Sequence, residues 1–133
     1  VAKRFEAAPF SATYARLAKA EVAHAHTIYP FWQAETNAKT DFETVYAGLT
    51  GEILEGGEAL QDVLVKVGRM GANACLPLVE LALGIEYAAY DLYRTLADNG
   101  PDEGVSAVFM QLAQAEKSHM EALTQTVALC RQA

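Results

Sequence analysis

The chain has 133 residues, a length that suits one domain with a single hydrophobic core. Its formal net charge of −7 argues against nucleic acid and against an anionic membrane surface as partners, because both require a basic protein face. No apolar run approaches the roughly 18 residues of a membrane span, and no secretory leader is recognisable, so we expect a cytoplasmic protein.

The first predicted helix covers residues 10–32. Tyr14, Leu17 and Ile28 fall on one face of it, which is the spacing of an amphipathic helix. Pro30 and the polar stretch after it are expected to end or kink this helix, because proline lacks the backbone N–H that helical hydrogen bonding needs.

A connection with short helices of its own is predicted over residues 41–73. Asp41 is a good N-cap for the first short helix. Gly56 and Gly57 favour a turn, which separates this helix from a second one. The connection is long enough to cross from one end of a helical bundle to the other.

Two long helices are predicted after the connection, over residues 74–97 and 105–130. The segment between them, DNGPDEG, is the strongest turn signal in the chain. No segment shows the alternating polarity of a strand. We therefore expect an all-α fold that forms a single domain over residues 1–133.

An internal repeat relates the first and last of these helices. Residues 11–24 and 106–119 share seven of 14 residues at a constant offset, including a Glu and a His at the end of each copy. We interpret this as a duplicated helical hairpin, which gives four helices. The counterpart of Glu86 would then lie upstream of Val1. We expect the first helix of the bundle to be missing from the sequence or to come from a partner chain.

Two Glu-x-x-His motifs carry the candidate chemistry. Residues three apart share one face of a helix, so each motif can present a carboxylate and an imidazole to one cation. Both motifs, and a glutamate on a third helix, interrupt apolar stripes where core side chains belong. Because buried carboxylates need compensation, a cation best explains such a cluster, and iron or manganese suits this donor set. The predicted metal ligands are Glu21, His24, Glu86, Glu116 and His119.

Several polar residues also have interpretations that involve no metal. A single Glu-x-x-His pair is usually solvated or salt-bridged, and only the matched registers of the two motifs favour metal. The glutamates beside the Gly-Gly turn are interpreted as caps or surface charge: Glu52, Glu55 and Glu58. The tyrosines of the third helix are interpreted as core packing, with the second or third within reach of a metal ligand: Tyr87, Tyr90 and Tyr93.

The two cysteines, Cys75 and Cys130, lie far apart and form no C-x-x-C pair. This excludes a zinc ribbon, a rubredoxin-type iron centre and a thioredoxin-like motif. We expect two free thiols that behave as small core residues in a reducing compartment.

In this order the motifs resemble the rubrerythrin branch of the ferritin-like di-iron proteins. That family places Glu on the first helix, Glu-x-x-His on the second, Glu on the third and Glu-x-x-His on the fourth. The chain supplies the last three as AEVAH, GIEYAAYDLY and AEKSH, and the resemblance covers about residues 10–32 and 74–130. It implies an up-down four-helix bundle with a long helical crossover. Its first-helix glutamate is missing here, which leaves the site one ligand short.

The resemblance also implies a function. The five predicted ligands would hold two iron ions, with manganese or a mixed pair left open, and the centre would reduce peroxide with electrons from an external donor. The segments FW and LEGG are similar to rubrerythrin-like domains that follow a rhodanese-type domain. The apolar faces predict a homo-oligomer. Two alternatives stay open, which are a non-catalytic metal-binding or dimerisation module of a larger protein and an iron or oxygen sensor.

Overall fold

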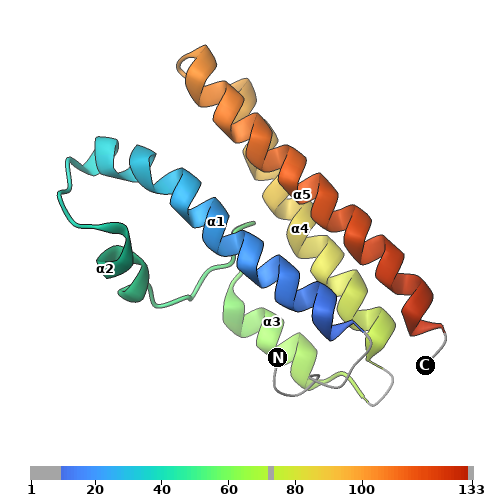
Figure 1. Cartoon of the computed structure of the whole chain (residues 1–133). Helices are drawn as coiled ribbons and strands as arrows, with labels where there is room; N and C mark the ends of the chain where they lie inside the picture. Colours follow the sequence, from blue (N-terminus) through green and yellow to red (C-terminus); the bar gives the residue numbers. More distant parts are fainter. Residues whose placement is uncertain (1–9, 72–73, 132–133) are drawn as a thin grey trace.

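The computed structural model describes residues 10–71 and 74–131, and helices dominate this part of the chain (Figure 1). The described residues form five helices, which confirms the all-α prediction. These are α1 (Ser11–Thr36), α2 (Phe42–Ala47), α3 (Leu60–Gly68), α4 (Cys75–Asp98) and α5 (Glu103–Cys130). No helix among them is both long enough and apolar enough to cross a membrane.

Helices α4 and α5 form an antiparallel hairpin and lie side by side along their length (Figure 1). Asp102 caps α5, because its Oδ1 accepts a hydrogen bond from the Val105 backbone N–H at 2.9 Å. Gly100 lies so close to the start of α5 that a Cβ atom there would meet Ser106 Oγ at 2.4 Å. The two long helices predicted over 74–97 and 105–130 are confirmed.

Helix α1 packs across this hairpin. Leu17 forms a buried cluster with Val79 and Leu123 at one end of the contact. Further along α1, Ile28 packs against a second buried cluster that contains Tyr93 and Leu112. In Figure 1 the last turns of α1 point away from the hairpin.

The predicted end of α1 at Trp32 is wrong, because the helix continues through Pro30 to Thr36. Pro30 is exposed, so the change in backbone hydrogen bonding that it causes faces solvent. Thr36 Oγ1 donates to the Trp32 carbonyl at 2.7 Å in the last turn. Asn37 ends the helix in the left-handed conformation that is common just after a helix C-terminus, with φ 52°.

The connection contains two short helices, as predicted, and its residues 72–73 lie outside the described part. Asp41 caps α2 by accepting the Thr44 backbone N–H at 3.0 Å. The Gly56–Gly57 turn separates α2 from α3. Val63 of α3 packs into a third buried cluster that also contains Leu78.

Three described helices, α1, α4 and α5, have the length of bundle helices. The ferritin-like four-helix bundle therefore stays a prediction, since residues 1–9 lie outside the described part and α2 and α3 are short. What the described residues do establish is a three-helix frame with the connection packed beside it.

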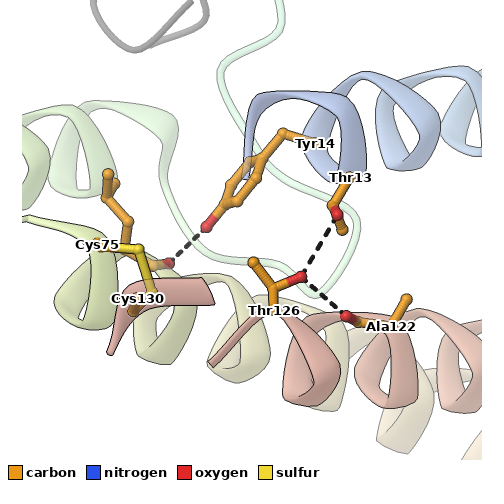
Figure 2. Close-up of a disulfide and its surroundings, with 7 residues drawn as sticks. Thr13, Tyr14, Cys75, Ala122, Thr126 and Cys130 are labelled. Carbon is orange, nitrogen blue, oxygen red and sulfur yellow. Dashed lines mark hydrogen bonds between the residues drawn. A yellow bond between two sulfur atoms is a disulfide. The ribbon is translucent and has the colours of Figure 1, made fainter. Parts of the chain in front are cut away.

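A disulfide joins Cys75, the first residue of α4, to Cys130, the last residue of α5 (Figure 2). The prediction of two free thiols is therefore wrong. An antiparallel hairpin of two long helices brings its first and last residues together, and the two Cα atoms lie 5.3 Å apart. Beside the disulfide, Tyr14 of α1 donates to the Leu78 carbonyl at 2.8 Å. The disulfide and this hydrogen bond thus link all three long helices at this end of the molecule.

Candidate metal centre

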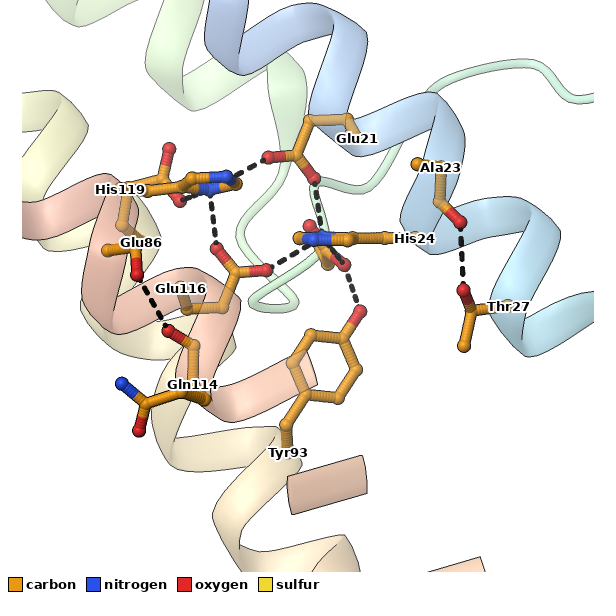
Figure 3. A network of polar contacts seen from close by, with 11 residues as sticks. Glu21, Ala23, His24, Thr27, Glu86, Tyr93, Gln114, Glu116 and His119 are labelled. Carbon is orange, nitrogen blue, oxygen red and sulfur yellow. Dashed lines mark hydrogen bonds and ion pairs between the residues drawn. The ribbon is translucent and has the colours of Figure 1, made fainter. Parts of the chain in front are cut away.

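Carboxylates and histidines from all three long helices converge on one interior place (Figure 3). It lies between the two apolar clusters along α1, so hydrophobic layers flank it on both sides. Three of its residues are largely withdrawn from solvent, with exposed fractions of 0% for Glu116, 6% for His24 and 8% for Glu86. The converging residues are Glu21 and His24 of α1, Glu55 of the connection, Glu86 of α4, and Glu116 and His119 of α5.

The structure brings together all five residues that the sequence predicted as ligands. The helical register explains this convergence, because each Glu-x-x-His motif places two side chains on one face of its helix. Those faces are the ones that α1 and α5 turn toward α4.

The cluster has two halves, each built around one histidine, and His24 belongs to the first. Its Nδ1 atom lies 2.8 Å from Glu116 Oε1 and 3.2 Å from Glu55 Oε1. Glu21 Oε2 is the third oxygen, at 3.5 Å. Three carboxylates of three different segments therefore surround one imidazole nitrogen.

His119 marks the other half in the same way. Its Nδ1 atom lies 3.0 Å from Glu116 Oε2 and 3.1 Å from Glu86 Oε2. Glu21 Oε1 lies 3.7 Å away. Glu21 and Glu116 thus belong to both halves, and each turns one oxygen toward each histidine.

Two overlapping donor sets follow from this geometry. Each has one imidazole and three carboxylates, and within each set the donor atoms lie within 4.8 Å of one another. Donors on opposite sides of one bound cation are separated by about 4 Å, so each set could hold a metal ion. The sets are Glu21, Glu86, Glu116 and His119, and Glu21, His24, Glu55 and Glu116.

Hydrogen bonds alone do not satisfy all the carboxylate oxygens of the cluster. One N–H on an imidazole nitrogen cannot point at three carboxylate oxygens at once. Glu116 Oε1 is fully buried and makes no hydrogen bond of acceptable geometry, although it lies 2.8 Å from His24 Nδ1. A buried oxygen in this state is costly unless a cation compensates it.

The electrostatics of the cluster shift the pKa values of its members. The carboxylates close to each imidazole, first that of Glu116, raise the pKa of His24 to about 12 and that of His119 to about 9. Burial raises the pKa of both Glu21 and Glu86 to about 7. Burial alone would also raise the pKa of Glu116, but the two histidines beside its carboxylate lower it to about 2. The metal-free cluster therefore holds several protons near neutral pH.

Glu55 is the site residue that sequence reasoning missed, and its interpretation as a cap or surface charge is wrong. Its carboxylate accepts a hydrogen bond from the hydroxyl of Tyr93, which is 2% exposed. Burial opposes ionisation of Glu55, but hydrogen bonds with His24, Glu21 and Tyr93 outweigh it and lower the pKa. Glu55 supplies a fourth carboxylate to the cluster, and the first-helix glutamate expected upstream of Val1 stays a prediction.

The turn after Glu55 explains how the connection reaches the centre. Gly56 lies directly on α4, where an added Cβ atom would come within 2.6 Å of Ala88 Cβ and 3.0 Å of the Ala89 backbone nitrogen. Gly57 has a φ of 90°, a conformation that side chains disfavour. The two glycines let the chain approach α4 closely and turn there, which holds Glu55 beside Tyr93.

We expect Gly56→Ala to destabilise the protein by about 1–3 kcal/mol, because backbone and side-chain atoms of α4 fill the space that the new methyl group needs. Gly84→Ala is the matched control on α4. Nothing lies within 4 Å of a Cβ there, and alanine in a helix interior should stabilise by roughly 0.5–1 kcal/mol. Urea denaturation of both variants checks this, and equal stabilities would contradict the close packing of Gly56.

The other tyrosines and glutamates considered in the sequence differ in burial and in their contacts. Tyr90 and Tyr93 pack in or against a buried cluster, as expected, and Tyr93 contacts a candidate ligand. Tyr87 is 61% exposed, so its prediction as a core residue is wrong. Glu52 is exposed, and Glu58 pairs with Lys66 near the surface, as expected for these two glutamates.

Comparison with protein families, with curated proteins and with solved structures finds no match to this chain. A chemistry for this chain can therefore be argued only from the residues of the cluster. Those residues offer a partly buried donor set of carboxylate oxygens and imidazole nitrogens that could hold metal.

Proposed function

We propose that the cluster holds two iron ions and that this centre reduces peroxide, in the manner of a rubrerythrin-like protein. The observation that carries the proposal is the sharing of Glu21 and Glu116. Each of these carboxylates turns one oxygen toward His24 and the other toward His119. A carboxylate shared in this way suits a bridge between two adjacent cations.

The charge of the ionised cluster is matched by two divalent cations. Four carboxylates contribute four negative charges when ionised, and two divalent ions balance them with both imidazoles neutral. With one divalent ion the cluster would have to keep protons, on the second imidazole or on a carboxylate, to balance the two remaining negative charges. Two ions and four ionised carboxylates therefore form a neutral unit that needs no bound protons.

The type of donor supports iron or manganese. Calcium and magnesium prefer donor sets made of oxygen alone, and structural zinc sites usually include thiolates. Here each set combines three carboxylates with one imidazole, and both cysteines are in a disulfide. Iron is preferred to manganese on the resemblance of residues 10–32 and 74–130 to rubrerythrins.

The protein's own residues have distinct parts in this proposal. When bound, two ferrous ions would supply one electron each for cleavage of the peroxide O–O bond. Glu21 and Glu116 hold the two positions together, and His24 and His119 each serve one of them. Tyr93 orients Glu55 by donating a hydrogen bond from its hydroxyl, as the hydrogen-bond partners of metal ligands commonly do. An external donor would return the electrons.

Loading the metal-free protein should release protons. The two imidazoliums must lose theirs to bind metal, and Glu21 and Glu86 are about half protonated at pH 7. Binding of two divalent ions at pH 7 should therefore release about three protons per chain. Calorimetric titration with Mn²⁺ in buffers of different ionisation enthalpy measures this number. Release of one proton or none would contradict the proposed protonation state of the cluster.

Anaerobic loading with Fe²⁺ followed by hydrogen peroxide tests the function. We expect each peroxide molecule to oxidise two ferrous ions, with loss of ferrous iron followed by a chelator assay. Failure of the chain to take up iron would rule out the proposal. Iron uptake without rapid oxidation by peroxide would instead favour the second candidate.

The second candidate is a non-catalytic metal-binding or dimerisation module, or a sensor of iron or oxygen. Large apolar side chains that lie open to solvent favour an interaction role. Leu49, Ile53 and Tyr87 have exposed fractions of 63%, 69% and 61%. A homo-oligomer that covers such side chains is compatible with both candidates.

A further inference from the structure

An apolar groove opens beside the cluster, between α1, the connection and α4. Its volume is about 580 Å³. Apolar side chains from all three segments form its walls, among them Leu17, Ile28 and Ile85. The charged residues that line it within the described part of the chain are three carboxylates of the cluster, Glu21, Glu55 and Glu86. The groove therefore joins an apolar space to the proposed reaction centre.

A second approach to the cluster is smaller and more polar. It lies between α1 and α5, has a volume of about 350 Å³ and is lined by Arg16, Ser118 and His119 among others. Hydrogen peroxide is only slightly larger than water, which occupies about 30 Å³ in the liquid. The polar approach is large enough to admit hydrogen peroxide. Access of hydrogen peroxide therefore does not explain why the apolar groove is present.

The size and lining of the groove are those of a site for an organic molecule. Pockets for such ligands range from about 300 to 1,000 Å³ and combine apolar walls with a few polar groups at one place. Leu49 and Ile53 line the groove and remain 63% and 69% exposed. An apolar ligand would cover side chains that are otherwise left in water.

We propose that this groove binds the organic part of an uncharged organic hydroperoxide, whose peroxide group then reaches the cluster. The inference rests on the proposed peroxide reduction and names its substrate class. With two ferrous ions bound, cleavage of the hydroperoxide O–O bond would take two electrons, one from each ion, and two protons from the buffered solvent. The products are the corresponding alcohol and one water molecule, with two ferric ions.

Charge narrows the substrate class further. The groove contains no cationic side chain among its described lining residues, and its charged groups are all carboxylates. An anionic ligand such as a free fatty-acid hydroperoxide would have no partner for its charge there. Neutral alkyl or aryl hydroperoxides fit the lining, and cumene hydroperoxide is a suitable representative.

Binding to the metal-free full chain tests the groove without any reaction. The probe is cumyl alcohol, the reduction product of cumene hydroperoxide, titrated calorimetrically. Ala18→Phe and Ala25→Phe place an aromatic ring in the groove from α1 and should each weaken binding at least about tenfold. The matched control is Ala23→Phe, an exposed alanine of the same helix that does not line the groove, and it should bind as the wild type does.

The iron-loaded protein gives the second measurement. The ratio of kcat/KM for cumene hydroperoxide to that for hydrogen peroxide should fall about tenfold in Ala18→Phe and Ala25→Phe, and stay unchanged in Ala23→Phe. If neither hydroperoxide reacts, the proposed function fails. If hydrogen peroxide reacts while the probe does not bind and the ratio does not change, the groove inference alone is overturned. The same holds if the groove variants change only the oligomeric mass, since a second copy then occupies the groove.

Discussion

Replacing Glu116 with glutamine is expected to abolish binding of both cations. Glu116 is fully buried and contributes one oxygen to each half of the centre, 2.8 Å from His24 Nδ1 and 3.0 Å from His119 Nδ1. An amide of the same shape has no charge and offers one oxygen only. Both halves therefore lose a ligand, and we expect the affinity for each cation to fall by more than about 100-fold.

Glu55→Gln provides the contrasting result, since Glu55 belongs to one donor set only. It should remove or weaken one cation and leave the other, so the stoichiometry falls from two to one. Glu80→Gln is the matched control, because Glu80 is exposed on α4 and belongs to neither set. Metal analysis after equilibrium dialysis measures all three variants. Retention of two cations by Glu116→Gln would show that the ligand assignment is wrong.

Replacing Cys130 with serine should lower the free energy of unfolding by about 4 kcal/mol. The disulfide closes a loop of 55 residues, and the loss of chain entropy in the unfolded state grows with the logarithm of loop length. The native contacts around it remain, so we expect a loss of stability without a change of fold. Urea denaturation under oxidising conditions measures this difference.

Two controls separate the disulfide from the serine itself. Cys75→Ser/Cys130→Ser should lose no more stability than Cys130→Ser alone, because either substitution breaks the same bond. A reductant should bring the wild type to the stability of the variants. If the unfolded, unreduced wild type reacts with two equivalents of a thiol reagent, the cysteines are free and the account of this end of the molecule is wrong.

Five of the six cluster residues could be predicted from the sequence, for a physical reason. Glu21, His24, Glu86, Glu116 and His119 lie on helices, where a period of 3.6 residues shows which side chains share a face with the core. A polar residue on an apolar stripe therefore stands out. The internal repeat added that the two Glu-x-x-His motifs occupy equivalent positions.

Glu55 could not be found in this way. It lies in a connection without periodicity. Its place in the cluster depends on Gly56, which packs against Ala88 and Ala89 of α4, more than 30 residues later in the chain. Long-range contacts of this kind leave no local pattern. The one signal was the Gly-Gly pair itself, which marked a turn but did not show where the turn packs.

The disulfide was missed although the predicted helices contained the information. Cys75 and Cys130 stand at the far ends of two consecutive helices of similar length joined by a tight turn. Such helices pack antiparallel, so their far ends meet. The prediction of free thiols rests instead on an assumed reducing compartment, which the spacing of the two cysteines does not establish. The end of α1 was missed for a different reason, since an exposed proline can be accommodated within a helix that tertiary contacts support.

Equilibrium binding of Fe²⁺ to the full chain under anaerobic conditions tests the central claim most directly. The two donor sets share Glu21 and Glu116, and four carboxylates balance the charge of two divalent ions. We therefore expect saturation at two ferrous ions per chain. Saturation at one ion per chain, or no binding at all, would contradict a two-cation centre built from these six residues.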